Sequence, residues 1–155
     1  MFKRILVPVD GGEPSIRALE EALAMAIGRR SETIAGASAT RTPQAALKIV
    51  HVLDDAFDQN ELIERGNAIL MRSVERAGEV GVAAESAMPR ASGRLISDVI
   101  LEEAKNYRAD LIVLGSHGYT GMREALMTFL GTVAKEVIRN STIPILLPGR
   151  LRSQL

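Results

Sequence analysis

The sequence predicts an α/β fold, in which an open, doubly wound sheet of five parallel strands carries helices on both faces. Short apolar runs of strand length alternate with longer stretches whose apolar residues recur at helical spacing, in the order β-α-β-α-β-α-β-α-β. Crossovers between parallel strands are right-handed, so the intervening helices cover both faces of the sheet. At 155 residues, the chain is expected to form a single domain over residues 1–155.

The first strand and helix are expected within residues 5–28. Pro8 interrupts the apolar run at 5–9, and the strand should end or bulge there because proline disfavours a central strand. Asp10 and the two glycines after it form a turn, and Pro14 suits the first turn of a helix. Gly28 is a suitable C-terminal cap. The apolar face of this helix is expected to consist of Ile16, Leu19, Leu23 and Ile27.

Residues 29–45 show no periodicity and contain many small polar residues. This composition predicts a long, exposed and mobile loop inserted between the first helix and the second strand. A regulatory or partner-binding role is one interpretation, and a tolerated surface insertion is the preferred one.

The second strand is expected at residues 47–52, where it ends at His51-Val52. Asp54, Asp55 and Asp58 follow, but they lack the spacing and the glycine of an EF-hand. We therefore interpret these carboxylates as solvated groups before the N-terminus of the next helix rather than as a cation site.

The middle of the chain predicts a helix, an edge strand and a third helix. Apolar residues at helical spacing run from Leu62 to Ala77, and Gly78 should end that helix. Residues 82–88 alternate weakly, as in an edge strand. Ser92 is a candidate N-cap for the third helix. This helix should bury Leu95, Ile96, Val99, Ile100, Ala104 and Tyr107.

Near the C-terminus, a buried strand at residues 111–114 is followed by GSHG at 115–118. Gly115 and Gly118 can adopt positive φ, so backbone N–H groups there can turn toward a ligand. A further helix begins at Gly131-Thr132, with residues 133, 134, 137 and 138 on its apolar face, and its N-terminus offers N–H donors. The two elements together form a candidate phosphate site.

These segments together resemble the universal stress protein family. ADLIVLGSHG and GTVAKEVI are similar to two parts of its C-terminal half, and KRILVPVDGGEPSIRALEEAL is similar to its start. The resemblance covers nearly the whole chain and implies a Rossmann-like sheet of strand order 3-2-1-4-5. Two segments differ from the family, apart from the glycine spacing: the long connection at 29–45, and PRASGR where many members have Gly-Asp, so contacts of that pair are not carried over.

The resemblance implies a site for ATP or a related adenine nucleotide, with Mg²⁺ bound alongside it, between the ends of strands one and four. Asp10 could accept hydrogen bonds from the ribose or base, or it could only cap its own turn. The residues expected to bind the nucleotide are Pro8, Val9, Asp10, Val50, Gly115, Ser116, His117, Gly118, Gly121, Gly131, Thr132 and Val133.

The spacing of the glycines departs from the family's ATP-binding pattern, in which nine residues precede the last glycine. Aligned on GSHG, this chain has twelve residues between Gly118 and Gly131. A nine-residue spacing does separate Gly121 from Gly131, with Gly118 as the first motif glycine. We prefer the alignment on GSHG because it places the loop at the end of the strand. The three extra residues then lengthen a helical segment before Gly131 by nearly one turn.

The sequence does not favour efficient catalysis. No Walker A sequence follows GSHG, and no nucleophile–base pair is evident. His117 could contact a phosphate, but packing on the loop is the preferred interpretation. We expect a stress-response or signalling protein that binds the nucleotide with slow or no hydrolysis. The alternatives are a true ATPase or nucleotidyl-transfer enzyme, and a family member that acts only through protein interactions.

The composition of the chain limits the kinds of partner that we expect it to bind. Nineteen acidic and nineteen basic residues balance, which argues against nucleic acid and anionic membranes, and the absence of cysteine excludes disulfides. No apolar run could span a bilayer, and MFKRILVPVD lacks the pattern of a signal peptide, so we expect a cytoplasmic protein. The apolar last strand at 145–147 is expected to pair across a two-fold axis in a homodimer.

Overall fold

The computed structural model describes residues 1–28, 43–54, 59–116 and 131–149. Within these residues the elements follow the expected alternation of strand and helix. They are β1 (Arg4–Pro8), α1 (Glu13–Ile27), β2 (Ala46–Val50), α2 (Gln59–Glu79), β3 (Ala84–Ala87), α3 (Ile96–Tyr107), β4 (Leu111–Val113), α4 (Thr132–Asn140) and β5 (Ile145–Leu146).

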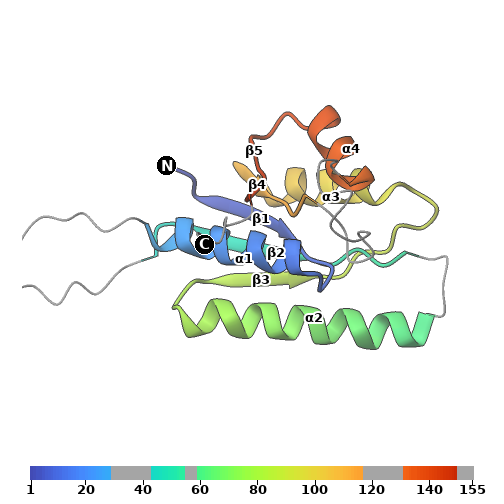
Figure 1. Ribbon diagram of the computed structural model, residues 1–155, viewed down its shortest axis with the longest axis horizontal. Coiled ribbons are helices and arrows are strands. Elements are labelled where there is room, and N and C mark those ends of the chain that lie inside the picture. Colours follow the sequence, from blue (N-terminus) through green and yellow to red (C-terminus); the bar gives the residue numbers. More distant parts are fainter. Residues whose placement is uncertain (29–42, 55–58, 117–130, 150–155) are drawn as a thin grey trace, which may run out of the picture.

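The sheet is parallel throughout and has the order β3-β2-β1-β4-β5, as expected (Figure 1). β1 lies at its centre, where Ile5 pairs with Leu47 of β2 on one side and with Leu111 of β4 on the other. β1 ends at Pro8, which pairs with Val50. The strand order reverses between β1 and β4, and in open α/β sheets this is where ligands bind.

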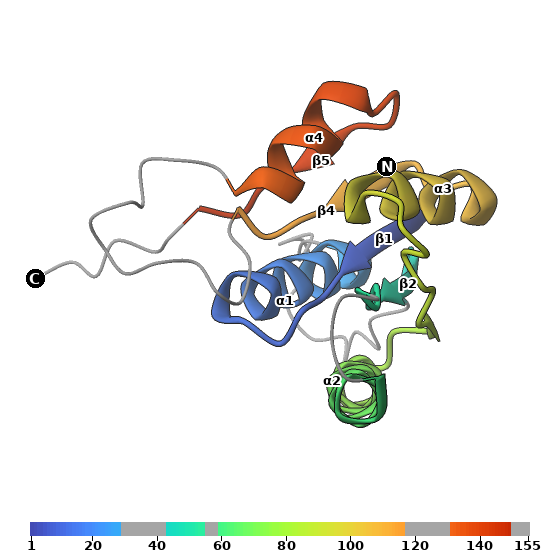
Figure 2. The same ribbon diagram turned by 90° about the vertical axis from the view of Figure 1, so that its right-hand side faces the viewer.

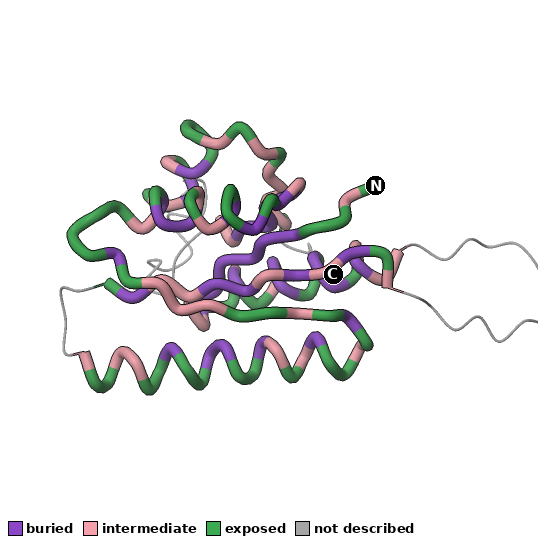
Figure 3. Tube along the Cα trace, turned by 180° about the vertical axis from the view of Figure 1, so that it is seen from behind, coloured by how far each residue is buried: buried purple, intermediate pink, exposed green. Residues whose placement is uncertain are grey.

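Two hydrophobic cores fill the spaces on either side of the sheet. Ile5 and Val7 of β1 point into the core under α1 and α2, whereas Leu6 points into the core under α3 and α4. Figure 2 shows the two helix pairs on opposite faces of the sheet, and Figure 3 shows the buried positions concentrated on the strands and on the inner sides of the helices. Burying each such aliphatic side chain contributes about 1.5–3 kcal/mol to folding.

Three large apolar side chains that we expected to be buried are exposed. Ile16 of α1 is 52% exposed, Leu95 is 60% exposed and Ile138 of α4 is 40% exposed. In α1 the sheet-facing positions are largely taken by small residues, including Ala18 and Ala22, which let the helix backbone lie close to the strands. Leu19 and Leu23 of α1 are buried as expected, so a periodicity count that favours large residues finds part of this interface and misses its small residues.

The start of α3 also differs from the expectation. Ser92 adopts a left-handed conformation with φ 51° and does not cap the helix. The N-cap is Leu95, which makes no side-chain capping hydrogen bond. α3 is held instead by its buried face, where Val99, Ile100 and Tyr107 pack.

The described end of the predicted loop at 29–45 has no regular secondary structure, and β2 begins directly after it at Ala46. Residues 29–42 lie outside the described part of the chain, as does the helical segment expected before Gly131. The Gln44 N–H donates to the Ala26 carbonyl over 2.7 Å, and Ala45 is buried in the core beneath α1. These two residues belong to the approach to β2.

Two further observations bear on possible partners. β5 forms an edge of the sheet, with Ile145 and Leu146 half-buried beside β4. In the described part of the chain, every helix is too short or too polar to cross a lipid bilayer.

Candidate functional site

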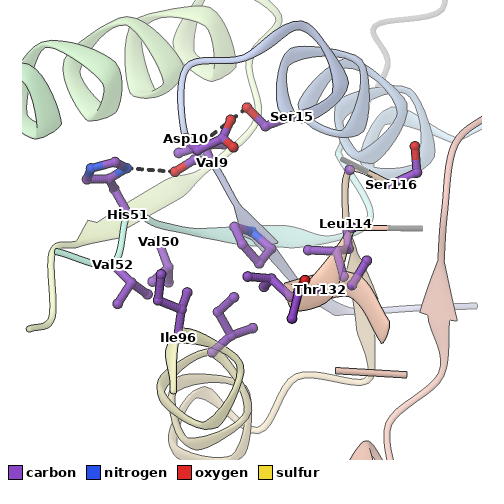
Figure 4. A pocket seen from close by; sticks show the side chains of 16 residues that line it. Val9, Asp10, Ser15, Val50, His51, Val52, Ile96, Leu114, Ser116 and Thr132 are labelled. Carbon is purple, nitrogen blue, oxygen red and sulfur yellow. Dashed lines mark hydrogen bonds between the residues drawn. The ribbon is translucent and has the colours of Figure 1, made fainter. Parts of the chain in front are cut away.

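A pocket of about 370 Å³ opens at the carboxyl ends of β1 and β4, where the strand order reverses (Figure 4). Its size lies within the range of small-molecule sites. Its lining consists of Pro8, Val9, Asp10, Ser15, Val50, His51, Val52, Ile96, Ile100, Leu114, Gly115, Ser116, Gly131, Thr132, Val133 and Ala134.

The structure brings most of the expected site residues together in this lining. The ones that line the pocket are Pro8, Val9, Asp10, Val50, Gly115, Ser116, Gly131, Thr132 and Val133. His117, Gly118 and Gly121 lie outside the described residues.

The turn after β1 fixes Asp10, the one carboxylate among the described residues that line the pocket. Asp10 Oδ1 accepts a hydrogen bond from the Gly12 N–H at 2.8 Å, and the Asp10 N–H donates to Ser15 Oγ at 3.2 Å. The Ser15 hydroxyl in turn donates to the Gly12 carbonyl at 3.0 Å. Asp10 therefore does cap its own turn, and this turn holds the carboxylate at the pocket wall.

Gly115 has a packing role rather than the one we expected. It is not among the glycines with positive φ, so that part of the expectation is wrong. A Cβ at Gly115 would lie 2.9 Å from the carbonyl carbon of Pro14 and 3.0 Å from the Ser15 nitrogen. The missing side chain thus lets the start of α1 lie directly against the end of β4, and this contact places Ser15 and Ser116 in one lining.

The start of α4 faces the same pocket. The Gly131 N–H donates to the Ser116 carbonyl at 2.8 Å, so this donor is already engaged. The Gly131 carbonyl accepts the first helical hydrogen bond, from the Lys135 N–H at 3.0 Å. Because the first N–H groups of a helix have no partner within it, Thr132 and Val133 present backbone donors where they line the pocket. The positive end of the helix dipole points the same way.

The pocket has a polar end and an apolar end. Asp10, Ser15 and Ser116 lie on the side of α1, whereas Val50, Val52 and Ile96 lie on the side of α3 (Figure 4). An elongated ligand that combines an apolar ring with hydroxyl and anionic groups fits such a division.

Several lining residues were missing from the sequence-based set. They are Ser15, His51, Val52, Ile96, Ile100, Leu114 and Ala134. Ile96 and Ile100 were expected in the core, and helical spacing cannot distinguish a core position from one at the mouth of a pocket. His51 was recognised only as part of a strand end. Its Nδ1 lies 2.8 Å from the Val9 carbonyl oxygen, a contact between strands that local pattern does not encode.

The described residues offer no ready-made metal site. No group of three or more His, Asp or Glu side chains that could hold a metal ion occurs among them. A cation at this pocket would therefore depend on ligand oxygens for much of its coordination.

Comparison with known proteins identifies the family of the chain. The model of the universal stress protein family matches residues 1–147. Universal stress protein YxiE of Bacillus subtilis is 35% identical over 95% of this chain and 99% of its own length. The solved structure of MJ0577 has a TM-score of 0.75 at 23% identity, covering 99% of each chain.

A universal stress protein from Archaeoglobus fulgidus, solved in complex with dAMP, has a TM-score of 0.67 at 22% identity and covers 93% of this chain and 95% of its own. The match to the family model spans the two strand ends and the α4 start that form the pocket. The chain belongs to the universal stress protein family.

Proposed function

We propose that this protein binds ATP or a related adenine nucleotide in the pocket between the ends of β1 and β4, and that it acts as a stress-response or signalling protein. One observation carries the proposal: a single pocket combines apolar side chains, a carboxylate and the N-terminus of a helix in one lining. Adenosine phosphates have matching parts, namely a flat base, a ribose with hydroxyls and an anionic tail.

Each part of the ligand has a chemically suitable surface. The first turn of α4 offers N–H donors and the positive end of the helix dipole to phosphate oxygens. The Asp10 carboxylate can accept from ribose hydroxyls, and Val50, Val52 and Ile96 can pack against the base. Mg²⁺ would be held mainly by the phosphates and water, as is usual for this ion. Structural relatives solved with dAMP, AMP and cAMP support an adenine nucleotide.

The described lining residues favour slow or no hydrolysis. A hydroxyl nucleophile needs a neighbouring base to take its proton. The Ser15 hydroxyl instead donates to the Gly12 carbonyl, and the His51 Nδ1 contacts the Val9 carbonyl. Neither group is arranged to activate a water or a hydroxyl.

Calorimetry with ATP and Mg²⁺ on wild type and on Gly131→Val tests the proposal. A valine at the N-cap of α4 should crowd the phosphates and reduce affinity by about tenfold or more, the equivalent of roughly 1.4 kcal/mol. Gly78→Ala is the control, because a Cβ there meets nothing within 4 Å. Absence of binding by wild type, or unchanged binding by a folded Gly131→Val variant, would contradict the assignment.

We also propose that the protein is a homodimer through β5. The edge position and the half-buried side chains of Ile145 and Leu146 leave apolar surface that a second copy could cover. Light scattering at micromolar concentrations should give the mass of a dimer for wild type and of a monomer for Leu146→Lys. A monomeric wild type would refute this part of the proposal.

A further inference from the structure

A side chain interrupts the hydrogen-bond ladder between β1 and β2 at the edge of the pocket. The Val9 N–H donates to the Val50 carbonyl at 2.8 Å, which continues the parallel pattern past Pro8. The next bond of a parallel ladder would run from the Val52 N–H to the Val9 carbonyl. The Val9 carbonyl instead lies 2.8 Å from His51 Nδ1 (Figure 4). Because a carbonyl oxygen only accepts, Nδ1 must carry the hydrogen.

Because His51 takes this position in the ladder, the Val52 N–H is left as a backbone donor at the pocket wall. The N–H groups of His51 and Leu53 donate to β3-side carbonyls, those of Ala87 and Pro89, at 3.0 and 2.9 Å. Successive N–H groups of an extended chain point in opposite directions, so the Val52 N–H points toward β1. It has no hydrogen-bond partner anywhere in the described part of the chain. Val52 lines the apolar end of the pocket, where a ligand can reach this donor.

A glycine in α2 provides the space for the imidazole. Gly66 is buried in the middle of the helix, where glycine is an unfavourable residue. A Cβ at Gly66 would lie 2.8 Å from His51 Cδ2 and 2.6 Å from Met88 Sδ. Gly78, in the same helix, has nothing within 4 Å of its Cβ position. The ring is thus confined between α2 and the Val9 carbonyl.

We propose that His51, seated by Gly66, is a positioning residue of the nucleotide pocket. The imidazole hydrogen-bonds the Val9 carbonyl, so the Val52 N–H cannot donate to that carbonyl. This N–H is directed at the bound base instead. The inference rests on the proposed nucleotide binding and adds a determinant of base selectivity. The Watson–Crick edge of adenine presents an unprotonated ring nitrogen, whereas that of guanine presents an N–H. A fixed N–H donor therefore favours adenine, and its orientation depends on His51.

The first experiment compares His51→Leu with His51→Asn by calorimetry against ATP and GTP. Asparagine places a donor nitrogen as many bonds from Cα as His Nδ1, so it can still bond the Val9 carbonyl. Leucine cannot, and the Val52 N–H should then return to that carbonyl. We expect His51→Leu to lose about 5- to 20-fold in ATP affinity and to bind ATP and GTP with more similar affinities. His51→Asn should keep most of the wild-type affinity for ATP and most of its preference for ATP over GTP. Thermal unfolding shows whether the variants fold.

The second experiment changes Gly66, which provides the space for the imidazole, and leaves His51 in place. Gly66→Ala should displace the imidazole and reduce the preference for ATP over GTP in binding affinity, as His51→Leu does. Gly78→Ala should leave this preference unchanged. Amide exchange of the wild type needs no variant: the Val52 amide should exchange fast in the free protein and slowly with ATP bound.

The outcomes separate this inference from the proposed function. If folded His51→Leu keeps wild-type affinity and ratio, or if the free Val52 amide is already protected, the inference is wrong while nucleotide binding stands. If His51→Asn behaves like His51→Leu, the donor role is likewise refuted. If wild type binds neither ATP nor GTP, the proposed function fails first.

Discussion

The two walls of the pocket are built by different means. The wall at the ends of β1 and β2 is held by polar side chains that bond the backbone: Asp10 to Gly12, Ser15 to Gly12 and His51 to Val9. The wall at the end of β4 and the start of α4 is held by backbone contacts: Gly115 lies directly against the backbone of α1, and the Gly131 N–H donates to the Ser116 carbonyl.

This difference teaches what each wall can tolerate. The first wall depends on hydrogen-bond donors and acceptors, so isosteric replacements that keep the polar atom should preserve it. The second depends on volume at Gly115, so even one methyl group should disrupt it there. Substitutions that separate polarity from size therefore test the comparison directly.

The largest effect is expected at Gly115. Alanine there would bring Cβ within 2.9–3.0 Å of the Pro14 and Ser15 backbone, which cannot move as easily as a side-chain tip. We expect Gly115→Ala to lower the free energy of unfolding by about 2 kcal/mol, measured by urea denaturation. Gly149→Ala is the matched control, since nothing lies within 4 Å of its Cβ position. A Gly115→Ala protein as stable as wild type would contradict the argument that a side chain at this position does not fit.

A smaller effect is expected at Asp10, where alanine and asparagine can be compared. Asp10→Ala removes the acceptor for the Gly12 N–H and should cost about 1 kcal/mol of unfolding free energy. Asp10→Asn keeps an oxygen acceptor and should retain most of that stability. If the carboxylate also contacts the ligand, both variants should weaken ATP binding in calorimetry. Equal stability of the two variants would show that the turn does not depend on this bond.

The smallest effect is expected behind the first wall, where Arg76 of α2 bonds Glu20 of α1. The hydrogen bond from Arg76 lowers the pKa of Glu20 below its ordinary value. A lowered pKa in the folded state gives stability that is present above the unfolded pKa and is lost as pH falls through the folded pKa. Both side chains are more than 40% exposed, so solvent weakens the pair.

Urea midpoints at pH 7 and pH 3 should therefore show a slightly larger loss on acidification for wild type than for Glu20→Gln. ATP binding by Glu20→Gln should match wild type at pH 7, because the pair lies outside the pocket lining. A weaker affinity of this variant would mean that the first wall depends on the contact between α1 and α2.

The sheet and its strand order could be predicted because their signals are local and repeated. Buried strands such as β4 appear as unbroken apolar runs, and the resemblance of ordered segments supplied the order. Helix orientation was less predictable, since Leu95 and Ile138 are apolar but exposed. Ser92 has the composition of an N-cap but not its backbone conformation.

The site could be predicted only where a residue itself marks a strand end or a helix start. Asp10, Gly131 and their neighbours meet that condition and line the pocket. The role of His51 depends on a carbonyl in another strand and on a glycine in a later helix, so no local pattern contains it. Gly115 lines the pocket, but it does so by close packing against α1 and not through the positive φ that we expected.

The hydrogen bond between the Gly131 N–H and the Ser116 carbonyl has a consequence for chain length. It fixes the start of α4 beside the end of β4, so a backbone contact between described residues sets the position of Gly131. Thr132 and Val133 therefore line the pocket in this chain although twelve residues, and not nine, separate Gly118 from Gly131.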